Sequence, residues 1–552
     1  MTRSDRLALL ISLLAVLAAA IVIDRVYERL PHIEDEVAYA WQATVIANGQ
    51  LTIPSPPQPK SFLVPFVIDY QGQRFGKYPP AWPALLAIGV RLGGRFLVNP
   101  LLAGLGVWLT YRLGKRLFSE LAGLMAAGLT LTSPFFLMNS GSLLSHPFGL
   151  VLGAAFALAW LDAFTGPLSR HFRGVQPVSP TPSSPPPRVG IDHRWLATLV
   201  AALSLGVLIL TRPMTAVAVC FPFTLHGVYL LVRGDAHTRR RLIVLGIVTV
   251  ALASLYFVWQ YAVTGDPLLN PYTLWWPYDK VGFGPGYGHA SGGHNLIHAY
   301  INTDESLSAG YSDLFGWWRY SWIFLPFGLW AARRNRSAWL VGSIFPSLVL
   351  FYSAYWIGSS LYGPRYYYEG LYSLTIFSAA GIMWLAGWSS ARVVAPAGTG
   401  TAGGVLGRWL GHLRRVNWRR IRALSVTALL TLLVSVNLLF YTPVRLGGMY
   451  GLYQIKRADL QPFLTPQALA LTPALVIVYS DHWMPYGALI QLEDPYLTTP
   501  FIFAWSMTPE IDASLSAYFP GRSVYHYYPD EPGVFYDAPR PTSHPGGETP
   551  VK

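Results

Sequence analysis

Apolar runs long enough to cross a lipid bilayer recur along most of this chain, and they constrain its fold more than any other feature. A membrane-spanning helix needs about twenty predominantly apolar residues. A soluble chain of this size carries roughly a quarter charged residues, whereas this one carries 12% and is 52% hydrophobic. The sequence therefore predicts an all-α polytopic membrane protein with about eleven spans. These spans are expected at residues 7–23, 97–111, 121–137, 143–164, 195–210, 214–231, 242–261, 317–332, 338–357, 366–388 and 423–440.

The first apolar run follows the basic segment "MTRSDR" and includes three consecutive alanines near its end, a pattern that signal peptides share. The run is long, however, and nothing after it resembles a mature soluble domain. We therefore expect a retained first span with the N-terminus in the cytoplasm.

The basic residues cluster in short loops between apolar runs. Counting spans alternately from a cytoplasmic N-terminus places "YRLGKR", "RGDAHTRRR", "RRNR" and "RWLGHLRRVNWRRIR" all on the cytoplasmic side, as the positive-inside rule requires. We therefore interpret the formal net charge of +13 as a topology signal and expect no nucleic-acid partner. The proline-rich segment 165–193 falls on the same side and is expected to be an extended linker.

Three longer segments are left for the outer face, at residues 24–96, 264–316 and 441–552. The last alternates β-like runs, "ALVIVYS", "PFIFAW" and "RSVYHYY", with a helical run, "PEIDASLSAYF". This pattern predicts a small C-terminal extracytoplasmic α/β domain at 441–552, after a transmembrane domain at 1–440. The protein is thus expected to be a multi-pass protein of the cytoplasmic (inner) membrane.

The first outer segment contains "PPAWPALLAIGVRLGG", which is too short and interrupted to span comfortably. We expect it to form a helix lying in the membrane interface. Trp82, Arg91 and Arg95 would hold it there.

The same segment begins with three adjacent carboxylates, Glu34, Asp35 and Glu36, in "LPHIEDEVAYAWQA". Adjacent carboxylates raise one another's pKa unless a cation, a metal or a substrate compensates. The alternative is a solvated acidic turn that caps the following helix. The three acids thus indicate either a helix cap or a functional site.

Three cations are expected on the outer face, although the basic clusters lie inside. They are Lys77 in "FGKYPPAWPALLA", Arg212 in "LILTRPMTAV" and Arg365 in "SSLYGPRYYYEGLYS", which also contains Glu369. Each alone is compatible with an interfacial anchor among lipid headgroups. Together they can neutralise an anion such as a lipid phosphate.

Histidines in the middle outer segment are the only weak candidates for a metal site, at His289, His294 and His298. His294 and His298 share one helix face, but no HExxH pattern accompanies them, and a glycine-rich substrate loop is the alternative. The single cysteine, Cys220, allows no intrachain disulfide. No Walker loop, dinucleotide fingerprint or GxSxG elbow occurs, which excludes the common ATP-driven and esterase classes. A divalent metal is the only cofactor left open.

Five motifs in order, "EDEVAYAWQA", "GKYPPAWPALLA", "SLLSHPF", "TRPMTA" and "GPRYYYEGLYS", resemble the GT-C class of membrane glycosyltransferases. The resemblance is strongest to protein O-mannosyltransferases and to the aminoarabinose transferases that modify lipid A, and it covers about the first 390 residues in topology and order. It implies transfer of a sugar from a polyprenyl-phosphate donor to a hydroxyl of a lipid, glycan or protein acceptor on the outer face of the membrane.

The resemblance also implies roles for single residues. Asp35 would be the general base of an inverting transfer, and Glu36 would orient Asp35, bind a sugar hydroxyl or help hold a metal. The leaving phosphate has low proton affinity, so it needs cations rather than a general acid. The residues implied in binding the donor and its lipid phosphate are Lys77, Arg212, Arg365, Tyr78, Glu369 and His146.

Two departures and two other functions accompany this interpretation. Glu34 makes the base ambiguous by one position, and Tyr78 separates Lys77 from the prolines, which many relatives place directly after the lysine. A transporter or flippase of lipid-linked saccharides would also want outer cations and many helices, although no internal repeat is visible. A non-catalytic membrane scaffold would tolerate replacement of Asp35.

Overall fold

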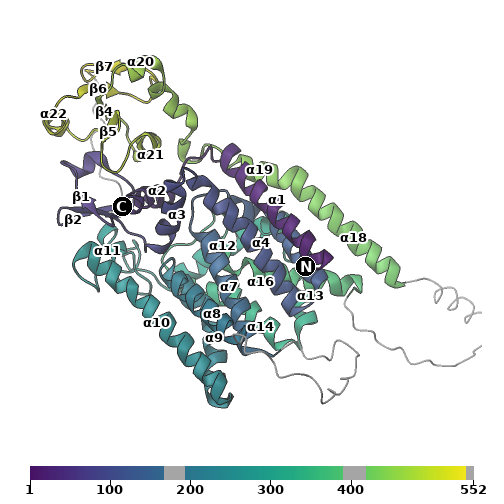
Figure 1. The fold of residues 1–552 in the computed structure, drawn as a ribbon. Helices are drawn as coiled ribbons and strands as arrows, with labels where there is room; N and C mark the ends of the chain where they lie inside the picture. Colours follow the sequence, from purple (N-terminus) through teal and green to yellow (C-terminus); the bar gives the residue numbers. More distant parts are fainter. Residues whose placement is uncertain (167–192, 389–417, 542–552) are drawn as a thin grey trace, which may run out of the picture.

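The computed structural model describes residues 1–166, 193–388 and 418–541. Figure 1 shows a long helical bundle with the four-stranded sheet at one end and the N-terminus towards the other. Within these described ranges, seven helices are long and apolar enough to cross a membrane, which confirms a multi-pass architecture. They are α1 (Arg3–Arg25), η2 with α4 (Arg95–Leu117), α7 (His146–Phe164), α9 (Pro213–Arg233), α10 (Ala236–Thr264), η5 with α16 (Arg365–Ala386) and the run from α18 (Trp418–Gly447).

The expected count of eleven is not reached by length and composition in the part of the chain that the structure describes. Helices α5 (Glu120–Leu131) and α6 (Pro134–Ser140) make an eighth span only if they are counted together, because the chain bends by 64° between them. Ser133 caps α6 and Pro134 occupies its first turn, so the break follows from residues that start a helix rather than continue one.

Three other expected spans are shorter helices. Helix α8 (His193–Ile209) has 17 residues, and α13 (Leu325–Ala332) has 8. The expected run 338–357 is divided into α14 (Arg336–Gly342) and α15 (Ile344–Tyr352). The number of times that the chain crosses the membrane therefore stays a prediction.

Glycines bring the first helices of the bundle into close contact. A Cβ on Gly104 of α4 would lie 2.5 Å from the side chain of Val16 in α1, and one on Gly114 would lie 2.8 Å from the Cα of Gly123 in α5. Small residues at such crossings let the backbones approach, which is how helices gain packing energy within a membrane.

The first outer segment, residues 24–96, folds into a small unit of its own, which we call the lid. Helix α2 (Glu34–Ala47) and α3 (Ala81–Arg91) flank three short antiparallel strands in the order β1-β3-β2. The bounds of the intervening elements are β1 (Ile53–Pro54), η1 (Pro59–Phe62), β2 (Val67–Tyr70) and β3 (Gln73–Gly76).

The expected interfacial helix exists as α3, but its expected anchors have other partners. The Trp82 indole is buried and donates to the carbonyl of Leu143 at 3.1 Å. Arg91 donates to the carbonyl of Ala47 at 2.6 Å. The Trp82 bond joins α3 to the bundle, and the Arg91 bond joins α3 to α2 within the lid.

The middle outer segment carries α11 (Pro271–Trp275) and α12 (Leu296–Asp313), and a 3-10 turn, η4 (Trp318–Tyr320), follows them. After α19 (Thr442–Gly447), three short helices lead to the sheet. These are η7 (Leu452–Gln454), η8 (Arg457–Phe463) and α20 (Pro466–Leu469).

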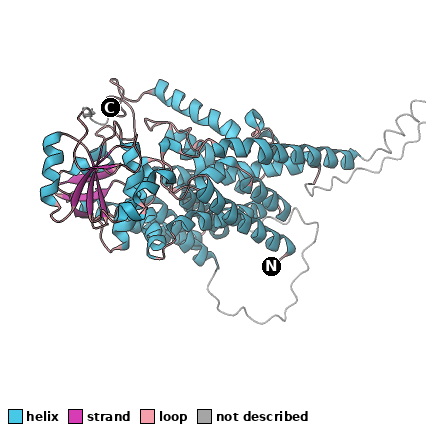
Figure 2. Ribbon diagram, turned by 90° about the horizontal axis from the view of Figure 1, so that it is seen from above, coloured by secondary structure: helices cyan, strands magenta, loops and turns pink. Residues whose placement is uncertain are grey.

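The C-terminal tail forms a four-stranded sheet in the order β5-β4-β6-β7, in which β4 pairs in parallel with β5 and β6, and β7 is antiparallel to β6. Helices surround this sheet, as Figure 2 shows. The three expected β-like runs correspond to β4, β5 and β6, and the expected helix to α22. The bounds are β4 (Ala474–Val478), α21 (Trp483–Leu489), η9 (Ile490–Leu492), β5 (Phe501–Trp505), α22 (Pro509–Tyr518), β6 (Ser523–Tyr527) and β7 (Phe535–Tyr536).

The tail sheet packs on the lid, because Phe62 of η1 shares a buried cluster with Leu475 and Ile477 of β4. Of the expected proline-rich linker 165–193, residues 167–192 lie outside the described residues. Most of the basic segment "RWLGHLRRVNWRRIR" lies outside them too.

Candidate active site

The three adjacent acids occupy the first turn of α2, where the helix dipole favours negative charge. Asp35 is the one in direct contact with other expected site residues. Its Oδ1 accepts a hydrogen bond from the Tyr78 hydroxyl at 2.5 Å, and its Oδ2 lies 3.5 Å from Nη2 of Arg365. The Asp35 side chain keeps 23% of its surface exposed, so a carboxylate oxygen can still be approached.

Glu36 points the other way and is 1% exposed. Its carboxylate accepts from the backbone N–H of His32 at 2.9 Å, from that of Leu143 at 2.7 Å and from the Tyr362 hydroxyl at 3.2 Å. It also reaches back to the N–H of Ile33, the N-cap of α2, at 3.4 Å. The helix-cap interpretation therefore applies to Glu36, which ties the lid to the turn before α7.

Glu34 lies at the edge of the site and is partly buried. Burial raises the pKa of its carboxyl group above the usual value, and the charge on Asp35 adds to that effect. Of the three acids, Asp35 is thus the one held in ion-pair and hydrogen-bond contact with the expected site residues.

Lys77 follows β3 and is 3% exposed. Its Nζ lies 3.4 Å from Oδ2 of Asp279 and sits over the ring of Phe66, 3.5 Å from the ring centroid. The rings of Tyr272 and Trp276 lie 5.0 Å from the same ammonium group. Lys77 is therefore enclosed by aromatic faces that favour a cation, with one carboxylate as its partner.

Arg212 is the N-cap of α9 and reaches across to α7 and α15. Its guanidinium donates to the hydroxyls of Ser145 at 3.1 Å and Tyr352 at 3.2 Å. Ser145 in turn bonds Tyr39 of α2, whose ring packs against Tyr78 at a centroid distance of 4.4 Å. This chain of contacts connects Arg212 to the Asp35 side of the site.

Arg365 opens the 3-10 turn η5 (Arg365–Gly370), directly before α16 (Leu371–Ala386). Besides its contact with Asp35, its Nη1 is buried and has no hydrogen-bond partner among the described residues. A buried guanidinium N–H without an acceptor is costly. Arg365 therefore offers one donor that an anion at this site would satisfy.

Glu369 and His146 lie together behind Arg212. Oε1 of Glu369 is 3.3 Å from Nδ1 of His146 and 3.3 Å from Nε of Arg212, and both Glu369 and His146 are at most 1% exposed. Glu369 thus pairs with both His146 and Arg212. Glu369 and His146 fix the position of Arg212.

The candidate metal-binding histidines do not assemble a metal centre. His294 bonds the carbonyl of Ser353 at 2.9 Å and stacks on Phe283, while the ring of His289 packs on Trp356. Within the described ranges, no group of three or more histidine, cysteine or acidic side chains has the arrangement of a metal site.

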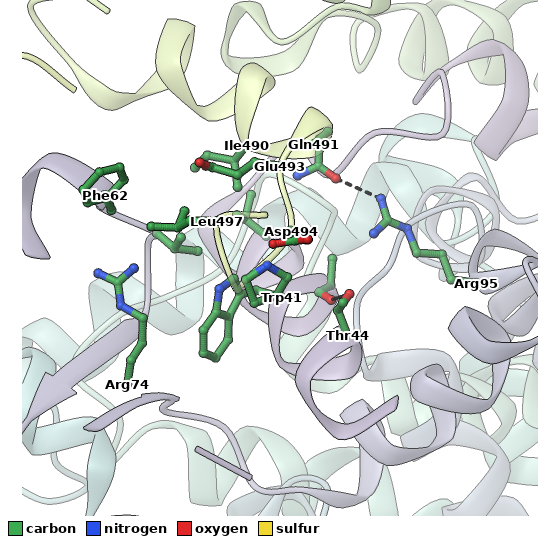
Figure 3. A pocket seen from close by; sticks show the side chains of 14 residues that line it. Trp41, Thr44, Phe62, Arg74, Arg95, Ile490, Gln491, Glu493, Asp494 and Leu497 are labelled. Carbon is green, nitrogen blue, oxygen red and sulfur yellow. Dashed lines mark hydrogen bonds between the residues drawn. The ribbon is translucent and has the colours of Figure 1, made fainter. Parts of the chain in front are cut away.

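A separate pocket lies on the opposite face of α2, between the lid and the tail (Figure 3). Trp41 and Thr44 line it from α2, and Glu493 and Asp494 line it from the tail. Arg95 crosses the junction and donates to Gln491 at 2.8 Å, drawn as the dashed line in Figure 3. The interfacial role expected for Arg95 is thus replaced by a bond that holds the tail to the bundle.

Sequence reasoning missed four residues that complete the site, Asp279, Tyr39, Ser145 and Tyr352. Three of them are neutral side chains. Tyr39 and Ser145 lie within the motifs "EDEVAYAWQA" and "SLLSHPF" but carry no charge that would single them out, and Tyr352 lies in none of the five motifs. Asp279 had a usable signal, because it is a lone carboxylate in the aromatic outer segment "YTLWWPYDK".

No protein-family model matches the chain, and no curated protein matches it. Among solved structures, ArnT from Cupriavidus metallidurans bound to undecaprenyl phosphate is similar, with a TM-score of 0.55 at 16% identity over 92% of this chain and 87% of that one. The apo form of the same protein has a TM-score of 0.52 at 16% identity over 94% and 92%. ArnT is an aminoarabinose transferase of the GT-C class. The likeness confirms the expected GT-C-like fold.

Proposed function

We propose that this chain is an integral membrane glycosyltransferase that moves a sugar from a polyprenyl-phosphate donor to an acceptor hydroxyl. The observation that carries the proposal is a partly exposed carboxylate, Asp35, whose Oδ2 lies 3.5 Å from Nη2 of Arg365. Lys77 and Arg212, from separate parts of the chain, pair with other carboxylates of the same site. The fold shared with ArnT, a protein whose structure holds undecaprenyl phosphate, supports the choice of donor class.

Asp35 is the general base in this proposal. It takes the proton from the acceptor hydroxyl while that oxygen forms a bond to the anomeric carbon of the sugar. The bond from this carbon to the phosphate oxygen breaks, its electron pair leaves with the lipid phosphate, and the configuration at carbon inverts. General-base assistance of this kind contributes about 10²- to 10⁴-fold to a rate.

The leaving lipid phosphate keeps the negative charge and needs positive groups close by rather than a proton donor. Arg365 supplies a guanidinium with one unsatisfied donor beside Asp35, Arg212 supplies a second, and Lys77 supplies an ammonium group. Tyr78 holds Asp35 in place through its hydroxyl. Glu36, Glu369 and His146 are assigned positioning roles, because Glu36 pairs with backbone N–H groups and Glu369 pairs with both His146 and Arg212.

The membrane orientation is part of the proposal. The lid with Asp35 packs against the tail sheet, so both lie on the same side of the bundle. The basic clusters place that side on the outer face of the cytoplasmic membrane, with the N-terminus in the cytoplasm. We also propose the division into a transmembrane domain at 1–440 and an extracytoplasmic domain at 441–552. The count of eleven spans is likewise proposed.

Reconstituted transfer tests the function. Purified protein is incubated with a panel of radiolabelled polyprenyl-phosphate sugars and a cell-envelope extract, and both transferred label and released polyprenyl phosphate are measured. We expect wild type to transfer label and Asp35→Asn to fold but lose transfer. Movement of labelled carrier across the vesicle membrane without a new glycosidic bond would instead establish the flippase alternative.

A further inference from the structure

Asp279 is a buried carboxylate that neither a motif nor the fold comparison singles out. It follows α11 in the middle outer segment and is 3% exposed. Its Oδ1 accepts from the Tyr355 hydroxyl at 2.8 Å and from the Trp356 indole at 3.1 Å, which leaves Oδ2 facing Nζ of Lys77 at 3.4 Å. The carboxylate is thus fixed on one side and directed at the lysine on the other.

Lys77 needs such a partner because the rings packed around its ammonium group are neutral. Burial lowers the pKa of the Lys77 ammonium below its usual value, and Asp279 is the largest influence that opposes this effect. Asp35 and Glu34 oppose it more weakly from α2. The aromatic side chains packed around the ammonium group, Phe66, Tyr78, Tyr272 and Trp276, carry no charge in the neutral pH range.

We propose that Asp279 is a positioning residue that keeps Lys77 charged and directed towards the site of the donor phosphate. This inference rests on the proposed function, because it takes the ligand of Lys77 to be a lipid phosphate monoester. A buried ammonium without a compensating charge loses its proton, because burial disfavours the charged form. Lys77 has three N–H donors, and Asp279 occupies one of them, so donors remain for a phosphate oxygen.

The charge on Asp279 has a measurable consequence for phosphate binding. Removing it lowers the pKa of Lys77 further, so the lysine is neutral over part of the range in which wild type is charged. Within that range the affinity of Asp279→Asn for a phosphate falls below that of wild type, by up to about tenfold per pH unit above the lowered pKa. Asp279→Glu keeps the charge and is expected to stay close to wild type.

Direct binding across pH tests the proposal without any need for turnover. Binding of radiolabelled undecaprenyl phosphate to detergent-purified protein is measured from about pH 6 to about pH 9, the range that bears on lysine, with undecaprenol as the blank. Taking each affinity relative to wild type at the same pH cancels the titration of the phosphate itself. Asp266→Asn is the matched control, because Asp266 is an exposed carboxylate of the same outer segment.

The outcomes separate the inference from the function on which it rests. The expected result is a ratio of Asp279→Asn to wild-type affinity that falls as pH rises, with Asp279→Glu and Asp266→Asn flat. A flat ratio, or tighter binding by Asp279→Asn at every pH, would overturn the positioning role. If wild type itself binds undecaprenol as well as undecaprenyl phosphate, the proposed donor class fails instead.

If Asp279→Asn does not fold, the Asp279→Glu variant carries the test. Loss of binding by the folded Asp279→Glu variant at every pH contradicts a role based on charge.

Discussion

At the scale of single residues, the first turn of α2 gives three adjacent acids three different environments. Asp35 contacts Tyr78 and Arg365. Glu36 accepts hydrogen bonds from backbone N–H groups and a tyrosine hydroxyl, and Glu34 lies at the edge of the site. Successive helix positions point about 100° apart, so neighbours in sequence need not share a role. The sequence predicted that this turn matters, but only the groups that pack around it, Tyr78, Arg365 and Tyr362 among them, distinguish the three acids.

Tyr78→Phe tests whether the phenol holds the proposed base. The change removes the hydroxyl that donates to Oδ1 of Asp35 and leaves the ring packing on Tyr39 intact. We expect kcat to fall by about tenfold or more, in line with the loss of a bond to a charged group of about 1.5–3 kcal/mol, and KM for the donor to change little. Unchanged kcat in steady-state transfer assays would show that the hydroxyl does not position Asp35.

Glu36→Gln tests the structural role assigned to Glu36. Glutamine keeps one acceptor oxygen but presents an amide to N–H groups that need an acceptor. We expect a loss of about 2–3 kcal/mol in stability, since buried donors are left unsatisfied. Thermal unfolding in detergent measures it, with Glu34→Gln as the control that is expected to unfold near the wild-type temperature.

At the scale of elements, glycines and prolines account for what the sequence predicted least well. The apolar runs predicted where helices form, but prolines divide or shorten some of them. Pro134 starts a new helix at a 64° bend, so one expected span became two helices. Pro326 lies in the first turn of α13, which is a single short helix. Hydropathy counts apolar residues and is blind to such breaks. Hydropathy likewise did not predict the sheet of the lid, whose strands have two to four residues.

Gly104→Val tests the contact between α1 and α4. Its Cβ would meet the Val16 side chain at 2.5 Å and the Ser12 carbonyl at 3.0 Å, so the helices are forced apart. We expect a loss of about 1–3 kcal/mol, the usual cost of overpacking, visible as a lower unfolding temperature in detergent. Gly128→Ala in α5 is the matched control, because a Cβ there has no atom within 4 Å.

At the scale of the whole molecule, the tail is joined to the bundle through the lid. Phe62 enters the sheet core of the tail, and Arg95 bonds Gln491 across the junction. The sequence predicted the strands and the helix of the tail from their alternation, but no local pattern encodes which surface the sheet covers. Contacts between residues almost 400 positions apart, such as Arg95 with Gln491, leave no signal in one sequence.

The junction between lid and tail is expected to respond to pH through Glu493. Burial raises the pKa of this carboxyl from 4.5 to about 8, so the folded state prefers its protonated form. Stability from this group is therefore present below pH 4.5 and is lost as pH rises towards 8. We expect Glu493→Gln to unfold at a higher temperature than wild type above that range, while the exposed Asp537→Asn control shows no such difference. A wild-type unfolding temperature that rises from pH 5 to pH 8 relative to Glu493→Gln would contradict the burial argument.

In the proposed reaction, Asp35 serves as the base of glycosyl transfer from a lipid phosphate. The most direct test of this role compares two adjacent, isosteric changes, Asp35→Asn and Glu34→Gln, for release of polyprenyl phosphate coupled to transfer of the sugar. We expect the rate of coupled release to fall by about 10²-fold or more in Asp35→Asn and to stay near normal in Glu34→Gln. Equal activity of Asp35→Asn and wild type, or a loss confined to Glu34→Gln, would contradict this role.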